Sequence, residues 1–123
     1  MQTEQIVRIT RRRVADLVKS RERSEDAVLF TGDEKRRNRR WPFPGAAELS
    51  LADGDGRKRW FATCGNLSFG GLGIITDRHF SPGTVLDISC HLPELTMVGR
   101  VTVLHCRPAG KGFLTGVRFD FDE

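Results

Sequence analysis

Residues 45–121 alternate apolar and polar positions in short runs, and turn-forming residues separate the runs. Alternation with a period of two is typical of β-strands, because successive side chains point to opposite faces. Glycine beside aspartate or proline marks the turns between the runs. The pattern predicts six strands over residues 47–51, 60–64, 72–76, 85–92, 98–106 and 113–119. Six short strands without an intervening helix favour an all-β fold, a small closed or partly closed barrel.

The N-terminal third has a different pattern. Apolar or small side chains recur at helical spacing over residues 4–23, at Ile6, Thr10, Val14, Leu17 and Val18. Because this stripe is thin, the predicted helix needs a partner surface, either the barrel or a second copy of the chain in a homodimer. Residues 24–44 resemble a linker. We therefore expect a partly helical N-terminal arm over 1–33 and a barrel domain over 34–123.

Positive charge is concentrated before the barrel. Residues 1–40 hold 12 Lys and Arg against 7 Asp and Glu, whereas residues 41–123 hold 8 against 9. The densest stretch contains Arg36, Arg37, Arg39 and Arg40, directly before Trp41. Arginine suits phosphates and guanine edges because its planar fork donates two parallel hydrogen bonds. A general nucleic-acid binder would more often spread such charge over its folded face.

Three cysteines and two neighbouring histidines are the candidate metal ligands of this sequence. Cys64, Cys90 and Cys106 are odd in number and widely spaced, which argues against a disulfide framework. The adjacent pairs Cys90-His91 and His105-Cys106 fall in predicted strands, where neighbours face opposite ways. One strand can then offer only one ligand of each pair, so no metal is expected.

Other functional classes find little support. No apolar run has the length of a membrane span, and no signal peptide is recognisable, so a cytoplasmic protein is expected. Asp77, His79 and Ser81 lie close together, but the turn beside Pro82 does not suggest an oriented triad. We therefore expect neither an enzyme nor a cofactor.

A second cluster of functional side chains covers residues 66–73, between the second and third predicted strands. Asn66 and Ser68 are short hydrogen-bonding side chains, and Gly70, Gly71 and Gly73 would permit positive φ or close approach of a ligand. A hairpin in which Asn66 and Ser68 bond their own backbone would have the same sequence. Taken alone, the loop does not decide between these interpretations.

The two clusters together resemble the PilZ domain family. Arg-x-x-x-Arg at Arg36 and Arg40 is followed by Asn-x-Ser-x-x-Gly at Asn66, Ser68 and Gly71. The resemblance covers about residues 34–121 and includes Pro82-Gly83-Thr84, Gly99-Arg100-Val101 and Gly116-Val117-Arg118-Phe119. It implies a six-stranded antiparallel β-barrel and a flexible arginine segment that closes over cyclic di-GMP, a bacterial second messenger. Many members carry a helix after the barrel, whereas this sequence ends at Asp122-Glu123.

The resemblance also implies the residues of the site. The ligand-binding residues would be Arg36, Arg40, Asn66, Ser68 and Gly71, with Lys35, Arg37, Arg39, Gly70 and Trp41 as secondary candidates. Arg37 and Arg39 could equally be solvated charges, and Trp41 could pin the linker to the barrel.

The implied function is a cyclic di-GMP receptor or adaptor that changes conformation on binding. It would signal through a protein effector in the control of motility, exopolysaccharide or adhesion. Two alternatives stay open. One is a PilZ-like interaction module without nucleotide binding. The other is a small barrel that binds single-stranded nucleic acid through Trp60, Phe61 and the arginines, which the charge distribution disfavours.

Overall fold

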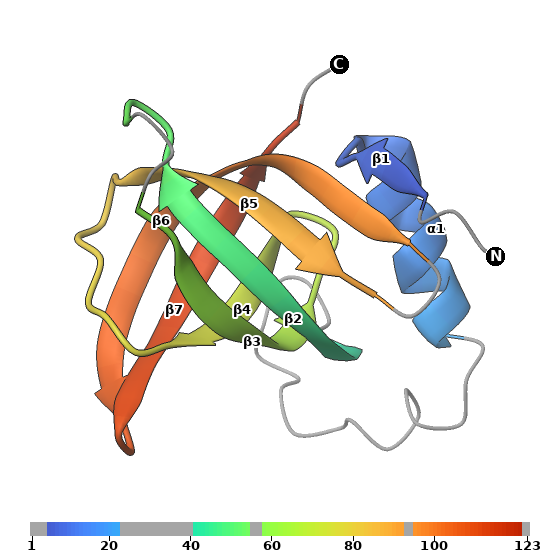
Figure 1. Ribbon diagram of the computed structural model, residues 1–123. Helices are drawn as coiled ribbons and strands as arrows, with labels where there is room; N and C mark the ends of the chain where they lie inside the picture. The colour runs from blue at the N-terminus through green and yellow to red at the C-terminus, as the bar shows by residue number, and fades with distance from the viewer. Residues whose placement is uncertain (1–4, 23–40, 55–57, 93–94, 122–123) are drawn as a thin grey trace, which may run out of the picture.

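The computed structural model describes residues 5–22, 41–54, 58–92 and 95–121. Within these ranges the chain forms one helix and seven strands: β1 Ile6–Arg8, α1 Arg11–Glu22, β2 Trp41–Leu51, β3 Trp60–Leu67, β4 Gly71–Thr76, β5 Val85–His91, β6 Thr96–Ala109 and β7 Gly112–Asp120 (Figure 1). The six strands expected from the alternation are all present, as β2 to β7.

The sheet closes on itself. Its strand order is β1-β6-β5-β2-β3-β4-β7, and β7 pairs again with β6. Every pairing among β2 to β7 is antiparallel, so these six strands make a closed barrel. The predicted fold class is confirmed. Because the barrel is closed, each of these six described strands is paired on both sides, except where one extends past the end of its neighbour.

Three strands extend by two or more residues beyond their predicted ranges, and the longer of the two hairpin strands, β6, does so at both ends, over Thr96–Ala109. β2 begins at Trp41, because its pairing with β3 continues past an irregularity between Pro42 and Gly45. Such an irregularity lets a strand accommodate prolines, which cannot donate to the ladder. β3 extends to Leu67 beyond a second irregularity between Cys64 and Asn66.

The helix predicted over residues 4–23 was wrong in its first part. Residues 6–8 form β1, which pairs in parallel with the start of β6, and the helix begins only at Arg11. Thr10 sets this boundary, because its Oγ1 accepts a hydrogen bond from the Arg13 backbone N–H at 3.2 Å. Thr at this position caps a helix by satisfying a backbone donor of the first turn. The prediction failed here because Ile6 fits a helical spacing, although Ile6 and Val7 are β-branched and also favour a strand.

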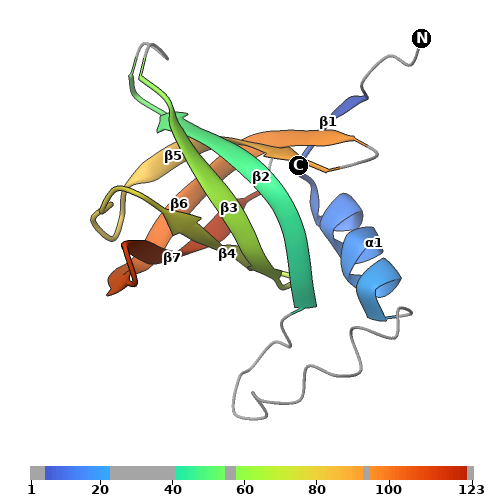
Figure 2. The ribbon, with the colours of Figure 1, turned by 60° about the horizontal axis from the view of Figure 1, so that its bottom comes forward.

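The helix α1 packs on one end of the barrel beside β2 (Figure 2). Val14 and Val18, one turn apart, have no exposed surface, and the half-buried Leu17 packs against the same core. Val7 and Ile9 join them, so β1, α1 and the barrel share one hydrophobic core. The partner surface expected for this helix is therefore the barrel itself.

The barrel interior is filled by alternate side chains of every strand. The most completely buried large residues of the core, under α1 and within the barrel together, are Ile9, Leu49, Leu67, Ile74, Leu86, Ile88, Met97, Val14, Val18, Val101 and Val103. The intervening positions face outward, and the candidate site is built from those.

Candidate ligand-binding site

The second motif forms the tight connection between β3 and β4. Asn66 lies within β3 rather than in a loop as expected, and it pairs with Gly73 of β4. The turn is closed by the Ser68 backbone N–H, which donates to the Gly71 carbonyl at 3.0 Å, and by the Gly71 N–H, which donates to Ser68 Oγ at 3.2 Å. Ser68 therefore holds the shape of the turn, whatever else it binds.

The glycines of this motif do not serve the conformational purpose expected of them. Among the described residues, only Gly83 and Gly110 have positive φ. A Cβ at Gly71 would instead collide with the backbone carbonyl oxygen of Val117, and one at Gly73 would lie 2.8 Å from Asn66 Oδ1. Glycine is therefore needed at these two positions because neighbouring protein atoms leave no room for a Cβ. At Gly70, by contrast, a Cβ would have no heavy atom within 4 Å.

The start of β2 lies directly beside this motif. Trp41 pairs with Leu67, and Pro42 pairs with Asn66. Arg40 is bonded to Trp41, so the arginine motif joins the sheet at the position where the Asn66-to-Gly71 motif begins. Arg36, Arg37, Arg39, Arg40 and Lys35 themselves lie outside the described residues, as does the side chain of Trp41.

Register brings a row of four outward positions together across four strands. Asn66 of β3 pairs with Gly73 of β4, and Gly73 pairs in turn with Gly116 of β7. On the other side of β7, Gly116 pairs with His105 of β6. The Asn66 amide lies over Gly73, and the His105 ring lies over Gly116. Neighbouring strands are about 4.8 Å apart. The row therefore presents an amide and an imidazole side by side on the barrel surface.

One cation also lies beside the motif. Arg118 is opposite Gly71 in the β4–β7 pairing, and its side chain is 57% exposed. Its one ion pair among the described residues is long, with 3.5 Å between Nη2 and Asp120 Oδ1. Arg118 and His105 could not be recognised as neighbours of Asn66 and Gly71 from the sequence, because only the strand register across the barrel brings them there.

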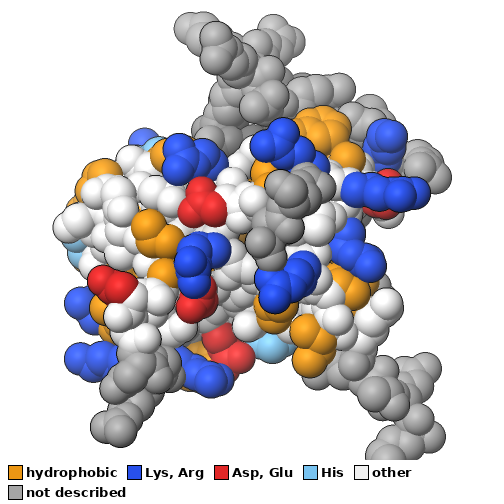
Figure 3. Space-filling view, turned by 90° about the horizontal axis from the view of Figure 1, so that it is seen from above, with side chains coloured by type: hydrophobic (Ala, Val, Ile, Leu, Met, Phe, Trp, Pro, Cys, Tyr) orange, Lys and Arg blue, Asp and Glu red, His pale blue; other side chains and the backbone are white. Residues whose placement is uncertain are grey.

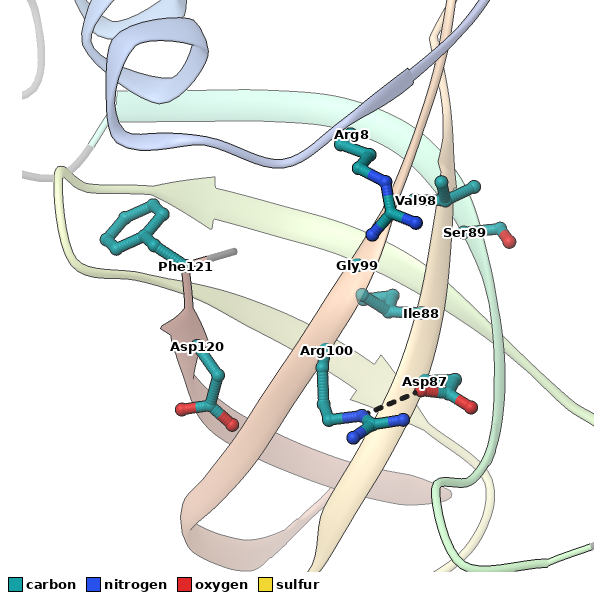
Figure 4. Close-up of a pocket in the computed structure, with 9 residues that line it drawn as sticks. All are labelled: Arg8, Asp87, Ile88, Ser89, Val98, Gly99, Arg100, Asp120 and Phe121. Carbon is teal, nitrogen blue, oxygen red and sulfur yellow. Dashed lines mark hydrogen bonds and ion pairs between the residues drawn. The ribbon is translucent and has the colours of Figure 1, made fainter. Parts of the chain in front are cut away.

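The surface away from this site shows charge of both signs. Lys and Arg side chains are interspersed with Asp and Glu on the face seen in Figure 3. A hollow of about 480 Å³ lies beside β1, β5 and β6, and in it Arg100 Nε is 3.1 Å from Asp87 Oδ1 (Figure 4). Asp120, at its other side, accepts a hydrogen bond from Thr102 Oγ1 at 2.7 Å. These partnered charges give the hollow no strong preference for an anion.

The cysteine-histidine pairs face opposite ways, as their strand positions predict. Cys90 is fully buried, and its hydrogen bond with Cys64, together with burial, raises the pKa of the Cys90 thiol well above its ordinary value. His91 faces outward, with Nε2 3.0 Å from Glu48 Oε2. Among the described residues, no three His, Cys, Asp or Glu side chains gather in a way that could hold a metal ion.

The barrel fold agrees with the protein family whose model the sequence matches. The model of the PilZ domain matches residues 34–123. The chain belongs to the PilZ domain family. Among solved structures, the PilZ domain with c-di-GMP of YcgR from Escherichia coli superposes with a TM-score of 0.58 at 17% identity, covering 71% of this chain and 79% of that one.

A second solved structure shares the same fold. The Bacillus subtilis inhibitor of motility MotI/DgrA superposes with a TM-score of 0.58 at 14% identity, covering 73% of this chain and 44% of that one. No curated protein matches the chain. At these identities the two structures establish the barrel fold, while the site of this PilZ domain has to be argued from its own residues. In the described part of the chain, no helix is long and apolar enough to span a membrane.

Proposed function

We propose that this PilZ domain is a receptor for cyclic di-GMP. The observation that carries the proposal is the pairing of Trp41 with Leu67 and of Pro42 with Asn66. It joins the Arg36-to-Arg40 motif to the same end of the barrel as Asn66, Ser68 and Gly71. A ligand with two phosphates and two guanines needs cations and edge-reading polar groups together, and this end of the barrel is where the chain can supply both.

Each residue has a chemical role in this proposal. Arg36 and Arg40 make forked contacts to phosphate oxygens or to guanine O6 and N7. Asn66 offers both a donor and an acceptor to a purine edge. Ser68 acts chiefly by fixing the turn, as its hydrogen bonds with Gly71 support. Gly70, with open space above it, allows the ligand to approach the backbone.

Secondary contributions come from Lys35, Arg37 and Arg39, which raise the local positive potential. Arg118 adds a cation from β7 beside Gly71. Because Arg118 has only a long ion pair among the described residues, its guanidinium can turn to a phosphate at little cost.

Ligand binding would also change the conformation of the segment between α1 and β2, which could transmit the signal. The arginine motif lies in sequence between Glu22, where α1 ends, and Trp41, where β2 begins, and α1 packs beside β2. A ligand held by both the motif and the barrel would therefore fix how these two elements connect, which is a recognised switching mode. The receptor would then act in the cytoplasm on a protein effector in motility, exopolysaccharide or adhesion control, without catalysis.

The nucleic-acid alternative receives less support. Trp60 is half-buried against Phe80, and their ring centroids are 5.4 Å apart. The Arg78 guanidinium lies 4.5 Å from the centre of the Trp60 ring. Phe61 is 70% exposed but faces away from Trp60, so the two rings do not form one stacking platform.

Titration calorimetry with cyclic di-GMP, GTP and a short oligonucleotide tests the proposal. We expect binding of cyclic di-GMP alone, and a loss of at least tenfold in affinity for Arg40→Ala and for Asn66→Ala, because each removes a charged or bidentate contact. An Arg40→Ala variant that bound as tightly as wild type would refute the site. Hydrogen exchange of α1 that was identical with and without saturating ligand would refute the switch.

A further inference from the structure

A group of exposed cations on β1 and α1 has no part in the proposed receptor. Residues 5–20 hold five exposed Lys and Arg side chains against one exposed Asp. The cations are Arg8, Arg11, Arg12, Arg13 and Lys19, and the acid is Asp16. This excess of four positive charges equals the net charge of the whole chain, +4. We call the surface that these five cations form the basic face.

The cations of the basic face do not help α1 to form. Arg11, Arg12 and Arg13 occupy the first turn of the helix, and no acidic residue lies there. The helix dipole is positive at this end, so it favours anionic side chains and disfavours cations. Arg11 has a contact of its own, because its guanidinium lies 5.2 Å from the centre of the Phe121 ring. Replacing Arg12 and Arg13 should therefore leave the fold intact.

The orientation of α1 turns the basic face away from the barrel. Val14 and Val18 point into the core and have no exposed surface. Arg12 and Lys19, about two turns apart, lie on the side of the helix that is turned away from these valines. The helix stands beside the barrel wall, and β1 leads directly into it (Figures 1 and 2). A partner that approached α1 from outside would meet the cations without disturbing the core.

An apolar side chain projects beside the cations. Ile6 is 64% exposed, and alternation along β1 places it on the same outward side as Arg8, while Val7 is buried. Exposed Lys and Arg beside an apolar group suit an anionic membrane, where cations contact headgroups and apolar groups enter the interface. Single-stranded nucleic acid would be bound with stacking aromatic rings, and residues 5–20 contain no aromatic residue.

We propose that the basic face docks on a bilayer surface of anionic phospholipids. Each Lys or Arg near such a surface strengthens binding about fivefold, so an excess of four charges favours an anionic over a neutral bilayer by about several hundredfold. The attraction decays within a Debye length, so added salt releases the protein. Docking requires no nucleotide, and this inference therefore stands apart from the proposed receptor.

Co-sedimentation of the full chain with lipid vesicles tests the proposal. We expect binding to vesicles of equal parts phosphatidylglycerol and phosphatidylcholine at low salt, release at high salt, and no binding to phosphatidylcholine alone. Arg12→Gln combined with Arg13→Gln should weaken binding roughly 25-fold, because two cations are lost. The Tm of this variant should be no lower than that of wild type, because the cations are removed from the positive end of the helix.

The matched control removes the same charge from the opposite end of β6. Thr96–Val98 pair with β1, whereas Arg107 and Lys111 are exposed at the β6–β7 hairpin (Figure 1). Arg107 is about 30 Å along the strand from Val98, which is several Debye lengths at physiological salt. Arg107→Gln combined with Lys111→Gln should therefore bind anionic vesicles within about twofold of wild type.

Three results would overturn the proposal. One is a wild-type protein that does not sediment with anionic vesicles at low salt. Another is an equal loss of vesicle binding in the two double variants, which would show that only the total charge matters. The third is binding of a single-stranded oligonucleotide without binding of vesicles, which would assign the basic face to nucleic acid.

Discussion

Gly71 should be required for folding as well as for any ligand, and Gly71→Ala measures that requirement. The added Cβ would be driven into the Val117 carbonyl oxygen, which belongs to the β4–β7 ladder and cannot rotate away as a side chain could. The two strands must separate locally. Forcing an extra carbon into a packed site typically costs 1–3 kcal/mol, and we expect about 2 kcal/mol here because backbone has to move.

The matched control is Gly70→Ala, one residue earlier. Its Cβ would have no heavy atom within 4 Å, and Gly70 is not one of the described residues with positive φ. The expected change in the free energy of unfolding is therefore within about 0.5 kcal/mol. If cyclic di-GMP approaches the backbone here, Gly70→Ala should nevertheless weaken binding. The pair of variants thus separates the folding role of this motif from its ligand role.

Thermal and urea unfolding both measure the difference. At about 2.1 cal/mol/K per residue, a chain of 123 residues has an unfolding entropy of about 0.26 kcal/mol/K. A loss of about 2 kcal/mol for Gly71→Ala then corresponds to a Tm lower by about 8 °C, against about 2 °C or less for Gly70→Ala. Equal Tm values and urea midpoints for the two variants would show that the reasoning about Val117 is wrong.

Three further predictions concern other parts of the molecule. Arg118→Ala should weaken cyclic di-GMP binding about fivefold at low salt and less at high salt, because an exposed cation is screened; calorimetry at two ionic strengths checks this, and a salt-independent effect would contradict it. Gly99→Ala should destabilise the fold by about 1–2 kcal/mol in urea unfolding, because its Cβ would lie 3.0 Å from Ile9 Cβ and press β1 away from β6; an unchanged midpoint would contradict it. In thiol labelling of the native protein, the half-buried Cys106 should react before the fully buried Cys90, whose raised pKa keeps it protonated; the reverse order would contradict this.

The barrel could be predicted from the sequence because the features that specify its strands and turns lie within short stretches of the chain. Alternation and turn residues determine where strands begin and end to within a few positions, and closure follows when six such strands have no helix between them. The strand at Ile6–Arg8 could not be predicted in this way, because three residues are too few to show alternation and they fit a helical spacing equally well. In the structure, the pairing of these residues with β6 and the capping bond at Thr10 separate strand from helix.

The candidate site could be proposed from the sequence only where its residues are continuous in the chain. Asn66, Ser68 and Gly71 could be selected from their spacing, but the reason for Gly71 could not, because Val117 lies in a distant strand. His105 and Arg118 lie near Asn66 and Gly71 through strand register alone. A shift of one position in β6 or β7 would turn these side chains to the other face, and the sequence does not specify the bulge that places His105 outward.

In the proposed receptor, the β3–β4 motif and the end of the arginine motif form one site for cyclic di-GMP. A titration of isotope-labelled protein, followed by backbone amide resonances, locates the ligand on the barrel. We expect cyclic di-GMP to shift the amides of residues 66–71, His105 and 116–118, and to leave those around Arg78 unchanged. Shifts confined to the hollow beside Arg8 and Arg100, or no shifts at saturating ligand, would contradict it.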